Sequence, residues 1–274
     1  MGAPDGHGIL GRMEKIGRAF AKAYESSFVP MLAIQGERLV LRGTGTLLAV
    51  ADRHFVLTAA HVFTRDAETI EGMCIYPGGG LSKIIPVPAN IHIVSDPLDL
   101  ALMPLDAEAV AMTAGRAFLS LERFALRYYP PEQGYFVLHG YPSCWLRKDA
   151  NNNPDPYALS YHTALYKGRT DRLEHYQQDV HILLEAPAGP NPFEGQPKNP
   201  PESLGGVSGC TVWEILRRGR DFDNWDPSRA RIVAIQTSVY SRSGVLKATY
   251  ARFILEALTE FYPDLRRAIR LHTG

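Results

Sequence analysis

Most of the chain consists of short apolar runs, each about as long as one β-strand, with turn residues between them. Leu39 and Leu41 alternate with polar neighbours, and a later run ends at Pro77-Gly78-Gly79-Gly80. The clearest runs lie at 46–50, 54–57, 73–76, 83–87, 91–94, 135–139, 159–166, 180–185, 210–216 and 231–238. Short strands at this spacing are typical of all-β barrels or sandwiches. We therefore predict two β-rich regions, at 32–118 and 134–243.

Helical periodicity marks the two ends of the chain. Apolar residues recur at intervals of three and four from Ile9 to Tyr24, which places them on one face of a helix. This N-terminal extension, residues 1–28, either packs on the body of the protein or, being basic and amphipathic, docks a partner or a membrane. A second apolar stripe runs from Leu246 to Phe261 and is stopped by Pro263, which predicts a C-terminal helix over 244–262.

Two irregular segments interrupt the second β-rich region. Residues 147–155 contain Asn151-Asn152-Asn153-Pro154, and residues 187–206 are rich in proline and glycine. Long inserts in a compact domain are often binding loops. We expect these two segments to contribute to specificity.

Composition and charge narrow the class of protein. The 274 residues are enough for a single domain with a substantial core, and 45% of them are apolar. Lys and Arg together number 29, as do Asp and Glu, so we expect no nucleic-acid partner. No apolar stretch of about 18 residues is present, so we expect no membrane-spanning segment. The widely spaced cysteines Cys74, Cys144 and Cys210 indicate reduced thiols, a cytoplasmic location and no metal site.

Three short segments combine chemically active side chains with apolar strands. His61 follows the run Phe55-Val56-Leu57-Thr58-Ala59-Ala60, Asp99 precedes Leu100-Ala101-Leu102, and Ser208 lies within Gly205-Gly206-Val207-Ser208-Gly209-Cys210. Each has an ordinary structural explanation when taken alone: packing for the histidine, turn capping for the aspartate, loop punctuation for the serine. The order His, Asp, Ser, each beside its own strand, is much harder to attribute to chance.

These residue types are the ones that acyl transfer requires. A serine hydroxyl becomes a good nucleophile when an imidazole takes its proton, and a carboxylate can hold that imidazole in the correct tautomer. Glycines beside the serine allow the backbone to turn so that two amide N–H groups point at one spot, where the substrate carbonyl oxygen becomes negative. The sequence therefore contains each component of such a site.

On these motifs the sequence resembles the chymotrypsin/trypsin-like serine proteases, in particular the compact bacterial branch without disulfides. Thr58-Ala59-Ala60-His61, Asp99-Leu100-Ala101-Leu102 and Gly206-Val207-Ser208-Gly209 match the family's three motifs, and the resemblance covers about residues 32–258. It implies an all-β fold, a double six-stranded antiparallel β-barrel, with N- and C-terminal helices and the site in the cleft between the barrels.

The resemblance also implies a role for each residue. His61 would be the general base, Asp99 the group that orients it, and Ser208 the nucleophile of a serine endopeptidase. The oxyanion donors would be the backbone N–H groups of Gly206 and Ser208. A peptide or protein is the implied substrate, and no cofactor is needed.

Some positions depart from the family or fit it loosely. Val207 occupies the place where secreted trypsins carry an acidic residue that pairs with a new N-terminus, so we expect no such activation switch. Glu202, six residues before Ser208, would either favour a basic substrate residue or be a solvated loop glutamate. The segment Gln236-Thr237-Ser238 is expected to supply the strand edge that pairs with an extended peptide.

Two other enzyme classes fit poorly, and one other function stays open. An α/β-hydrolase elbow has the pattern G-x-S-x-G and places its partners after the serine, whereas here Cys210 holds the fifth position and both partners precede. A relative with a cysteine nucleophile would carry its thiol at the position of Ser208. Cys210 lies two residues further on, where strand alternation should bury it as a small apolar side chain. The open alternative is a catalytically silent binding module, or a protease held inactive until a regulatory protein partner forms the oxyanion hole.

Overall fold

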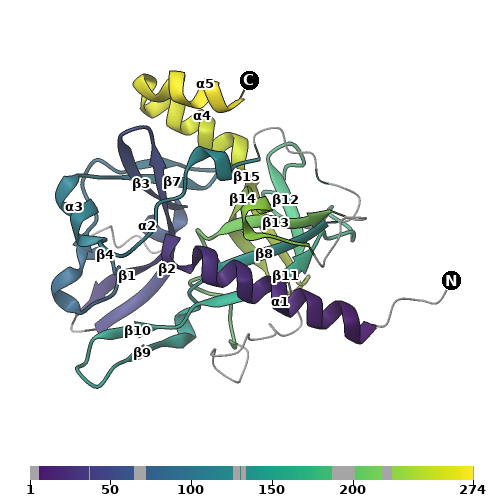
Figure 1. The fold of residues 1–274 in the computed structure, drawn as a ribbon, viewed down its shortest axis with the longest axis horizontal. Coiled ribbons are helices and arrows are strands. Elements are labelled where there is room, and N and C mark those ends of the chain that lie inside the picture. The colour runs from purple at the N-terminus through teal and green to yellow at the C-terminus, as the bar shows by residue number, and fades with distance from the viewer. Residues whose placement is uncertain are drawn as a thin grey trace.

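The structure is a computed structural model that describes residues 6–36, 38–64, 72–125, 130, 134–186, 201–217 and 224–273. Two curled antiparallel sheets stand side by side, each built from one half of the chain, with helices at both ends (Figure 1). The predicted all-β architecture of two antiparallel barrels is confirmed. The short 3₁₀ turns are η1 (Glu25–Ser27), η2 (Leu81–Lys83), η3 (Leu121–Arg123), η4 (Ser143–Trp145), η5 (Pro227–Arg229) and η6 (Pro263–Leu265).

The first sheet has seven strands in the order β5-β4-β1-β2-β3-β7-β6, one more than the six expected. Its strands are β1 (Phe28–Gln35), β2 (Arg38–Val50), β3 (Arg53–Ala59), β4 (Met73–Ile75), β5 (Ile85–Pro86), β6 (His92–Val94) and β7 (Leu100–Leu105). The short helices α2 (His61–Thr64) and α3 (Ala107–Met112) follow β3 and β7. Strands β4, β5 and β6 have only two or three residues each, which is why a count of strands from the sequence is uncertain here.

The second sheet has six strands in the order β11-β8-β13-β14-β15-β12. They are β8 (Gly134–Gly140), β11 (Leu159–Ala164), β12 (His181–Glu185), β13 (Thr211–Arg217), β14 (Arg231–Tyr240) and β15 (Val245–Tyr250). A bridge between Leu165 and Leu184 joins its two outer strands, so the sheet curls back on itself. Of the predicted binding loops, 147–155 forms a hairpin of β9 (Leu146–Lys148) and β10 (Pro154–Pro156), whereas 187–200 lies outside the described residues.

One predicted boundary is wrong. The C-terminal helix, expected over 244–262, is α4 (Ala251–Phe261), and Val245–Tyr250 forms strand β15 instead. All six residues of β15 are buried between β14 and β12. Pairing on both edges therefore overrides the helical spacing of the apolar residues, which continues without a break into α4.

The N-terminal helix α1 (Gly6–Tyr24) packs on the body of the protein, as the first of the two interpretations had it. Its Phe20 ring meets Trp213 of β13 edge-on at 5.2 Å between ring centroids, and Tyr24 stacks on the same indole at 4.5 Å. Met13 and Ile16 are buried on the same face. Each large apolar side chain buried in this way stabilises the fold by about 1.5–3 kcal/mol.

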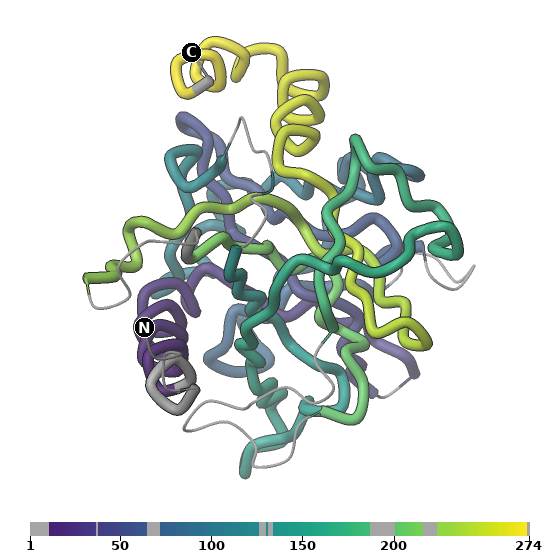
Figure 2. Tube along the Cα trace, turned by 90° about the vertical axis from the view of Figure 1, so that its right-hand side faces the viewer, coloured from purple at the N-terminus to yellow at the C-terminus, as the bar shows by residue number. Residues whose placement is uncertain are grey.

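The C-terminal helices α4 and α5 (Arg266–Thr273) project beyond the two sheets (Figure 2). Residues between them tie the end of the chain to the first sheet: the ring of Tyr262 contacts Phe55 at 4.9 Å, and Asp264 forms an ion pair with Arg53 at 2.8 Å. In the described part of the chain, no helix has the length and apolar character needed to cross a membrane.

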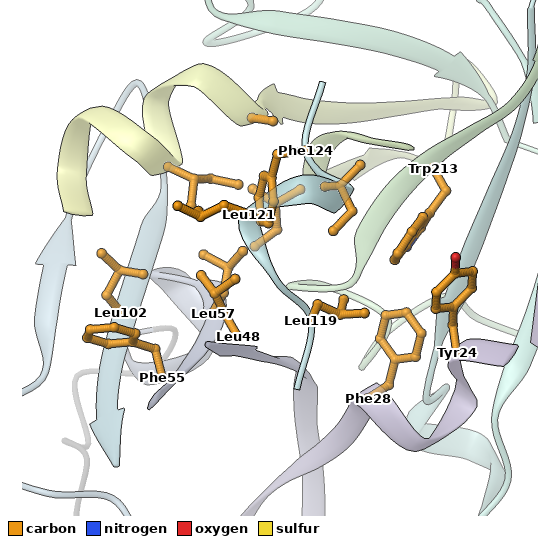
Figure 3. Close-up of a cluster of buried hydrophobic side chains, with 14 of the residues drawn as sticks. Tyr24, Phe28, Leu48, Phe55, Leu57, Leu102, Leu119, Leu121, Phe124 and Trp213 are labelled. Atoms are coloured by element: carbon orange, nitrogen blue, oxygen red, sulfur yellow. The ribbon is translucent and has the colours of Figure 1, made fainter. Parts of the chain in front are cut away.

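Apolar side chains from both sheets meet in one continuous core (Figure 3). Leu57 and Leu102 come from the first sheet, Trp213 from the second, and Leu119 and Phe124 from the segment that connects them. Because all five are buried, the two sheets cannot separate without exposing this cluster to water. The relative position of the sheets is therefore fixed where they face each other.

Candidate active site

His61 and Asp99 meet where strand β3 of the first sheet ends and its neighbour β7 begins. His61 begins helix α2 just after β3, and Asp99 lies immediately before β7, the strand that pairs with β3. The His61 Nδ1 atom is 2.7 Å from Asp99 Oδ2, and the His61 backbone N–H donates to Asp99 Oδ1 at 2.9 Å. An ionised carboxylate only accepts hydrogen bonds, so Nδ1 carries the proton and Nε2 is left with a free lone pair.

Ser208 lies on the second sheet's side of the same site. Its turn, Leu204–Val207, is closed by a hydrogen bond from the Val207 N–H to the Leu204 carbonyl at 3.1 Å. Gly206 occupies the third position of the turn with φ +89°, the value that a type II turn requires there. In the part of the chain that the structure describes, the Ser208 hydroxyl forms no hydrogen bond to His61 or to any other residue.

The turn also orients the Gly205–Gly206 peptide. The Gly205 carbonyl accepts from the Ser143 N–H at 2.7 Å, and in a trans peptide the N–H points the opposite way, so the Gly206 N–H points away from Ser143. Among the described residues, the N–H groups of Gly206 and Ser208 have no acceptor. The two predicted oxyanion donors are therefore both free for a ligand.

Thr44 of strand β2 fixes this turn from the first sheet. Its N–H donates to the Ser208 carbonyl at 2.8 Å, and its hydroxyl donates to the Gly206 carbonyl at 2.9 Å. The same hydroxyl accepts from the Tyr141 N–H at 2.9 Å. Sequence reasoning did not find Thr44, because a threonine within a strand has no local pattern that marks it.

His61, Asp99 and Ser208 line one cavity of about 560 Å³. Thr237 and Ser238, two of the predicted substrate-binding residues, line it as well. The structure thus brings together all three residues of the predicted triad and part of the predicted substrate edge.

Two predicted substrate-binding residues do not line the cavity. Glu202 is exposed and lies outside its wall, whereas the next residue, Ser203, is part of the wall. Gln236 is fully buried; its backbone N–H and C=O are used by Cys210 and Gly209, both at 2.9 Å. The predicted strand edge therefore starts at Thr237, because the bonds of Gln236 are already occupied by the residues that follow Ser208.

A buried lysine near the site was also missed. Lys247 of β15 is only 3% exposed; burial lowers the pKa of its amine, and the nearby carboxylates of Asp99 and Asp96 raise it. The helical spacing of residues 245–250 gives no sign that Lys247 is buried, because burial follows from its position in a strand that is paired on both edges. Cys210, by contrast, is buried as predicted, and burial raises the pKa of its thiol. The described residues contain no group of three or more His, Cys, Asp or Glu that could hold a metal ion.

Sequence comparisons find no relative: no protein family model and no curated protein matches this chain. Solved structures do match. An inactivated protease paralogue (S-I1) of the scabies mite is 13% identical, with a TM-score of 0.52 over 88% of this chain and 95% of its own. The VesB protease of Vibrio cholerae is 15% identical, with a TM-score of 0.52 over 87% of this chain and 64% of its own. A serine endoprotease of Yersinia pestis is 13% identical, with a TM-score of 0.50 over 93% of this chain and 66% of its own.

The chain thus has the chymotrypsin-like double-barrel fold of trypsin-like proteases. It spans about two thirds of the length of the two bacterial proteins. Because the same fold occurs in proteases and in an inactivated paralogue, the fold alone does not decide between catalysis and binding. That decision depends on the residues of the site.

Proposed function

We propose that this protein is a serine endopeptidase that cleaves peptide bonds through an acyl-enzyme on Ser208. The observation that carries the proposal is the contact of His61 Nδ1 with Asp99 at 2.7 Å, in a cavity that Ser208 also lines. This contact leaves Nε2 as the ring nitrogen able to take a proton, which is the state that a general base needs.

Each step moves atoms between groups of the site. The Ser208 Oγ attacks the substrate carbonyl carbon and its proton passes to His61 Nε2, while Asp99 stabilises the imidazolium. The proton then passes to the leaving amine as the C–N bond breaks, and an ester on Ser208 remains. Water, deprotonated by His61, hydrolyses the ester and restores the hydroxyl.

The turn at Gly206 supports catalysis without an activating partner. The hydrogen bond from Ser143 to the Gly205 carbonyl directs the Gly206 N–H away from Ser143, and among the described residues this N–H has no acceptor, so it is available as an oxyanion donor. One such donor contributes about 2.7–4 kcal/mol to stabilising the transition state.

A peptide or protein substrate would bind by adding a strand. Beyond Gln236, β14 pairs with β15 on one edge and with no other strand among the described residues, and Ser238 and Val239 line the cavity. An extended peptide can pair with this edge and bring its carbonyl to Ser208. We further propose that the protein acts in the cytoplasm on such substrates, without nucleic acid or membrane as a partner.

The test compares Ser208→Ala with Ser241→Ala, which removes another serine of the same cavity. Wild type and Ser241→Ala should react with a fluorophosphonate probe and cleave a peptide library. Ser208→Ala should do neither while it melts at the wild-type temperature. Labelling that persists in Ser208→Ala would show that the nucleophile is misassigned.

The second candidate is a binding module without turnover, which the similarity to an inactivated protease paralogue favours. Its cleft would hold a peptide on the edge of β14 and release it intact. If wild-type protein binds peptides from the library but neither cleaves them nor reacts with the probe, this second candidate replaces the first.

A further inference from the structure

His181 has two hydrogen bonds that fix its ring, and no step of the proposed reaction uses it. The side chain is buried at the start of β12, and the Gln177 backbone N–H donates to its Nδ1 at 3.0 Å. A ring nitrogen that accepts carries no proton, so the proton of the neutral ring is on Nε2. That N–H donates to the Pro97 carbonyl at 2.8 Å.

The acceptor belongs to the loop that carries Asp99. In this loop the N–H groups of Leu98 and Asp99 turn back to the Ser95 carbonyl at 3.1 and 3.2 Å. A second side chain from the second sheet binds the next carbonyl: the hydroxyl of Thr249 donates to Leu98 at 2.7 Å. Two consecutive carbonyls before Asp99 are thus held by β12 and β15 of the second sheet, although the loop itself connects β6 and β7 of the first.

Asp99 needs such support because of its backbone conformation. Its φ is +51°, in the left-handed region that non-glycine residues rarely adopt. Residues of this kind persist where the surrounding structure holds them in place. The bonds at Pro97 and Leu98 are the contacts from the second sheet that come immediately before it.

We propose that His181, together with Thr249, is a positioning residue that holds the 95–99 loop so that the Asp99 carboxylate reaches His61. The inference rests on the proposed function for its effect on rate, but the contact that it predicts can be observed without any reaction. His181 touches neither substrate nor the reacting atoms; it acts through the backbone before Asp99.

The surroundings of the ring favour the neutral form that this role requires. Burial lowers the pKa of His181, and the nearby Lys247 ammonium lowers it further; the contact with Pro97 and the Asp96 carboxylate act in the opposite direction. Tyr176 lies beside the ring, at 6.2 Å between centroids. A protonated ring would carry a hydrogen on Nδ1 and could no longer accept from the Gln177 N–H.

Two variants of the full chain separate the two bonds of the ring. His181→Gln places an amide N–H where Nε2 lies and can keep the bond to Pro97. His181→Asn places an amide oxygen where Nδ1 lies and can keep the bond from Gln177, but it is too short to reach Pro97. The pair therefore removes one bond each with an uncharged side chain.

We expect His181→Gln to label with a fluorophosphonate probe at close to the wild-type rate. His181→Asn should label about 10 to 100 times more slowly, because small displacements of catalytic groups have effects of this size. In peptide cleavage kcat should fall and KM should stay, since the substrate edge of β14 is not altered. By NMR, the downfield signal of the His61 Nδ1 proton should persist in His181→Gln and be lost or shifted in His181→Asn.

An unchanged rate and an unchanged His61 signal in His181→Asn would overturn the proposal. If both His181 variants fail to fold, Thr249→Val and Thr249→Ser replace them. Thr249→Val should slow labelling and shift the His61 signal, whereas Thr249→Ser should keep both as in wild type. Identical behaviour of these two variants would overturn the proposal. If wild-type protein does not label at all, the proposed function fails, while the NMR comparison still tests the positioning role.

Discussion

Replacing Gly206 by alanine perturbs the Leu204–Val207 turn, which carries one of the two proposed oxyanion donors, at a point where the structure leaves no room for a Cβ atom. A Cβ atom at this position would lie 2.4 Å from Leu41 Cδ2, 2.7 Å from the Tyr141 carbonyl oxygen and 2.8 Å from the Ser143 nitrogen. Two of these three atoms belong to the backbone and cannot rotate away. The φ of +89° is in addition unfavourable for alanine. The turn must therefore move, and the Gly206 N–H moves with it.

Under the proposed function the Gly206 N–H is an oxyanion donor, and the loss of one such donor sets the expected magnitude. It corresponds to a decrease in kcat of about 100- to 1,000-fold, or about 2.7–4 kcal/mol of transition-state stabilisation. The strained backbone should also lower the free energy of unfolding by about 1–3 kcal/mol. We expect KM to change little, because the donor acts on the charge that develops during reaction rather than on bound substrate.

Gly205→Ala is the matched control. Among the described residues its Cβ would meet the hydroxyl oxygens of Ser203 and Ser143, at 3.3 and 3.4 Å, and no other atom within 4 Å, and the φ of Gly205 is not positive. Kinetics of peptide cleavage, fluorophosphonate labelling rates and thermal melting of both variants form the assay. The reasoning is refuted if Gly206→Ala retains wild-type kcat, or if Gly205→Ala loses as much activity as Gly206→Ala.

Two further predictions concern buried polar groups. Thr44→Val removes the hydroxyl that bridges Gly206 and Tyr141. Urea unfolding should show a loss of about 2 kcal/mol in stability, and fluorophosphonate labelling should be slower. Unchanged stability would contradict this bridge. Burial lowers the pKa of His139 to about 3, below its value near 6.5 in the unfolded chain. Between these two values the unfolded chain binds the proton more readily, so the free energy of unfolding should fall as the pH decreases from about 6.5 towards 3. The slope from this group is up to about 1.4 kcal/mol per pH unit. His139→Gln should have a shallower slope than wild type over this range in urea unfolding, and equal slopes would contradict the assignment.

The parts of the site that lie on local motifs could be predicted from the sequence. The histidine after β3, the aspartate before β7 and the serine in its glycine-rich turn each stand beside the strand that carries them, and all three line one cavity. The strands of both halves were recognisable for the same reason, since alternation is a property of neighbouring residues. The sequence predicts helix for β15, because the apolar residues of this strand continue the spacing of α4.

What the sequence could not indicate are contacts between residues far apart in the chain. Thr44 binds Gly206 across 162 positions, and Thr249 binds Leu98 across 151. Neither residue belongs to a motif, because an isolated threonine has the same local pattern whether its hydroxyl meets a neighbour or a distant loop. Gln236 shows the same limit in another way. Its place in the order of segments predicts a substrate edge, but its backbone N–H and C=O are bound to Cys210 and Gly209.

Each of the two loops that carry Asp99 and Ser208 is held by hydrogen bonds from the other half of the chain. The serine turn of the second half is held by Thr44 of the first, and the aspartate loop of the first half is held by His181 and Thr249 of the second. Substitutions that accumulate in one half thus alter the reactive group carried by the other, and the two halves must change in concert during evolution. A chimera that joined either half to its counterpart from a distant protein of the same fold would lose a support in each direction unless both sets of partners were transplanted.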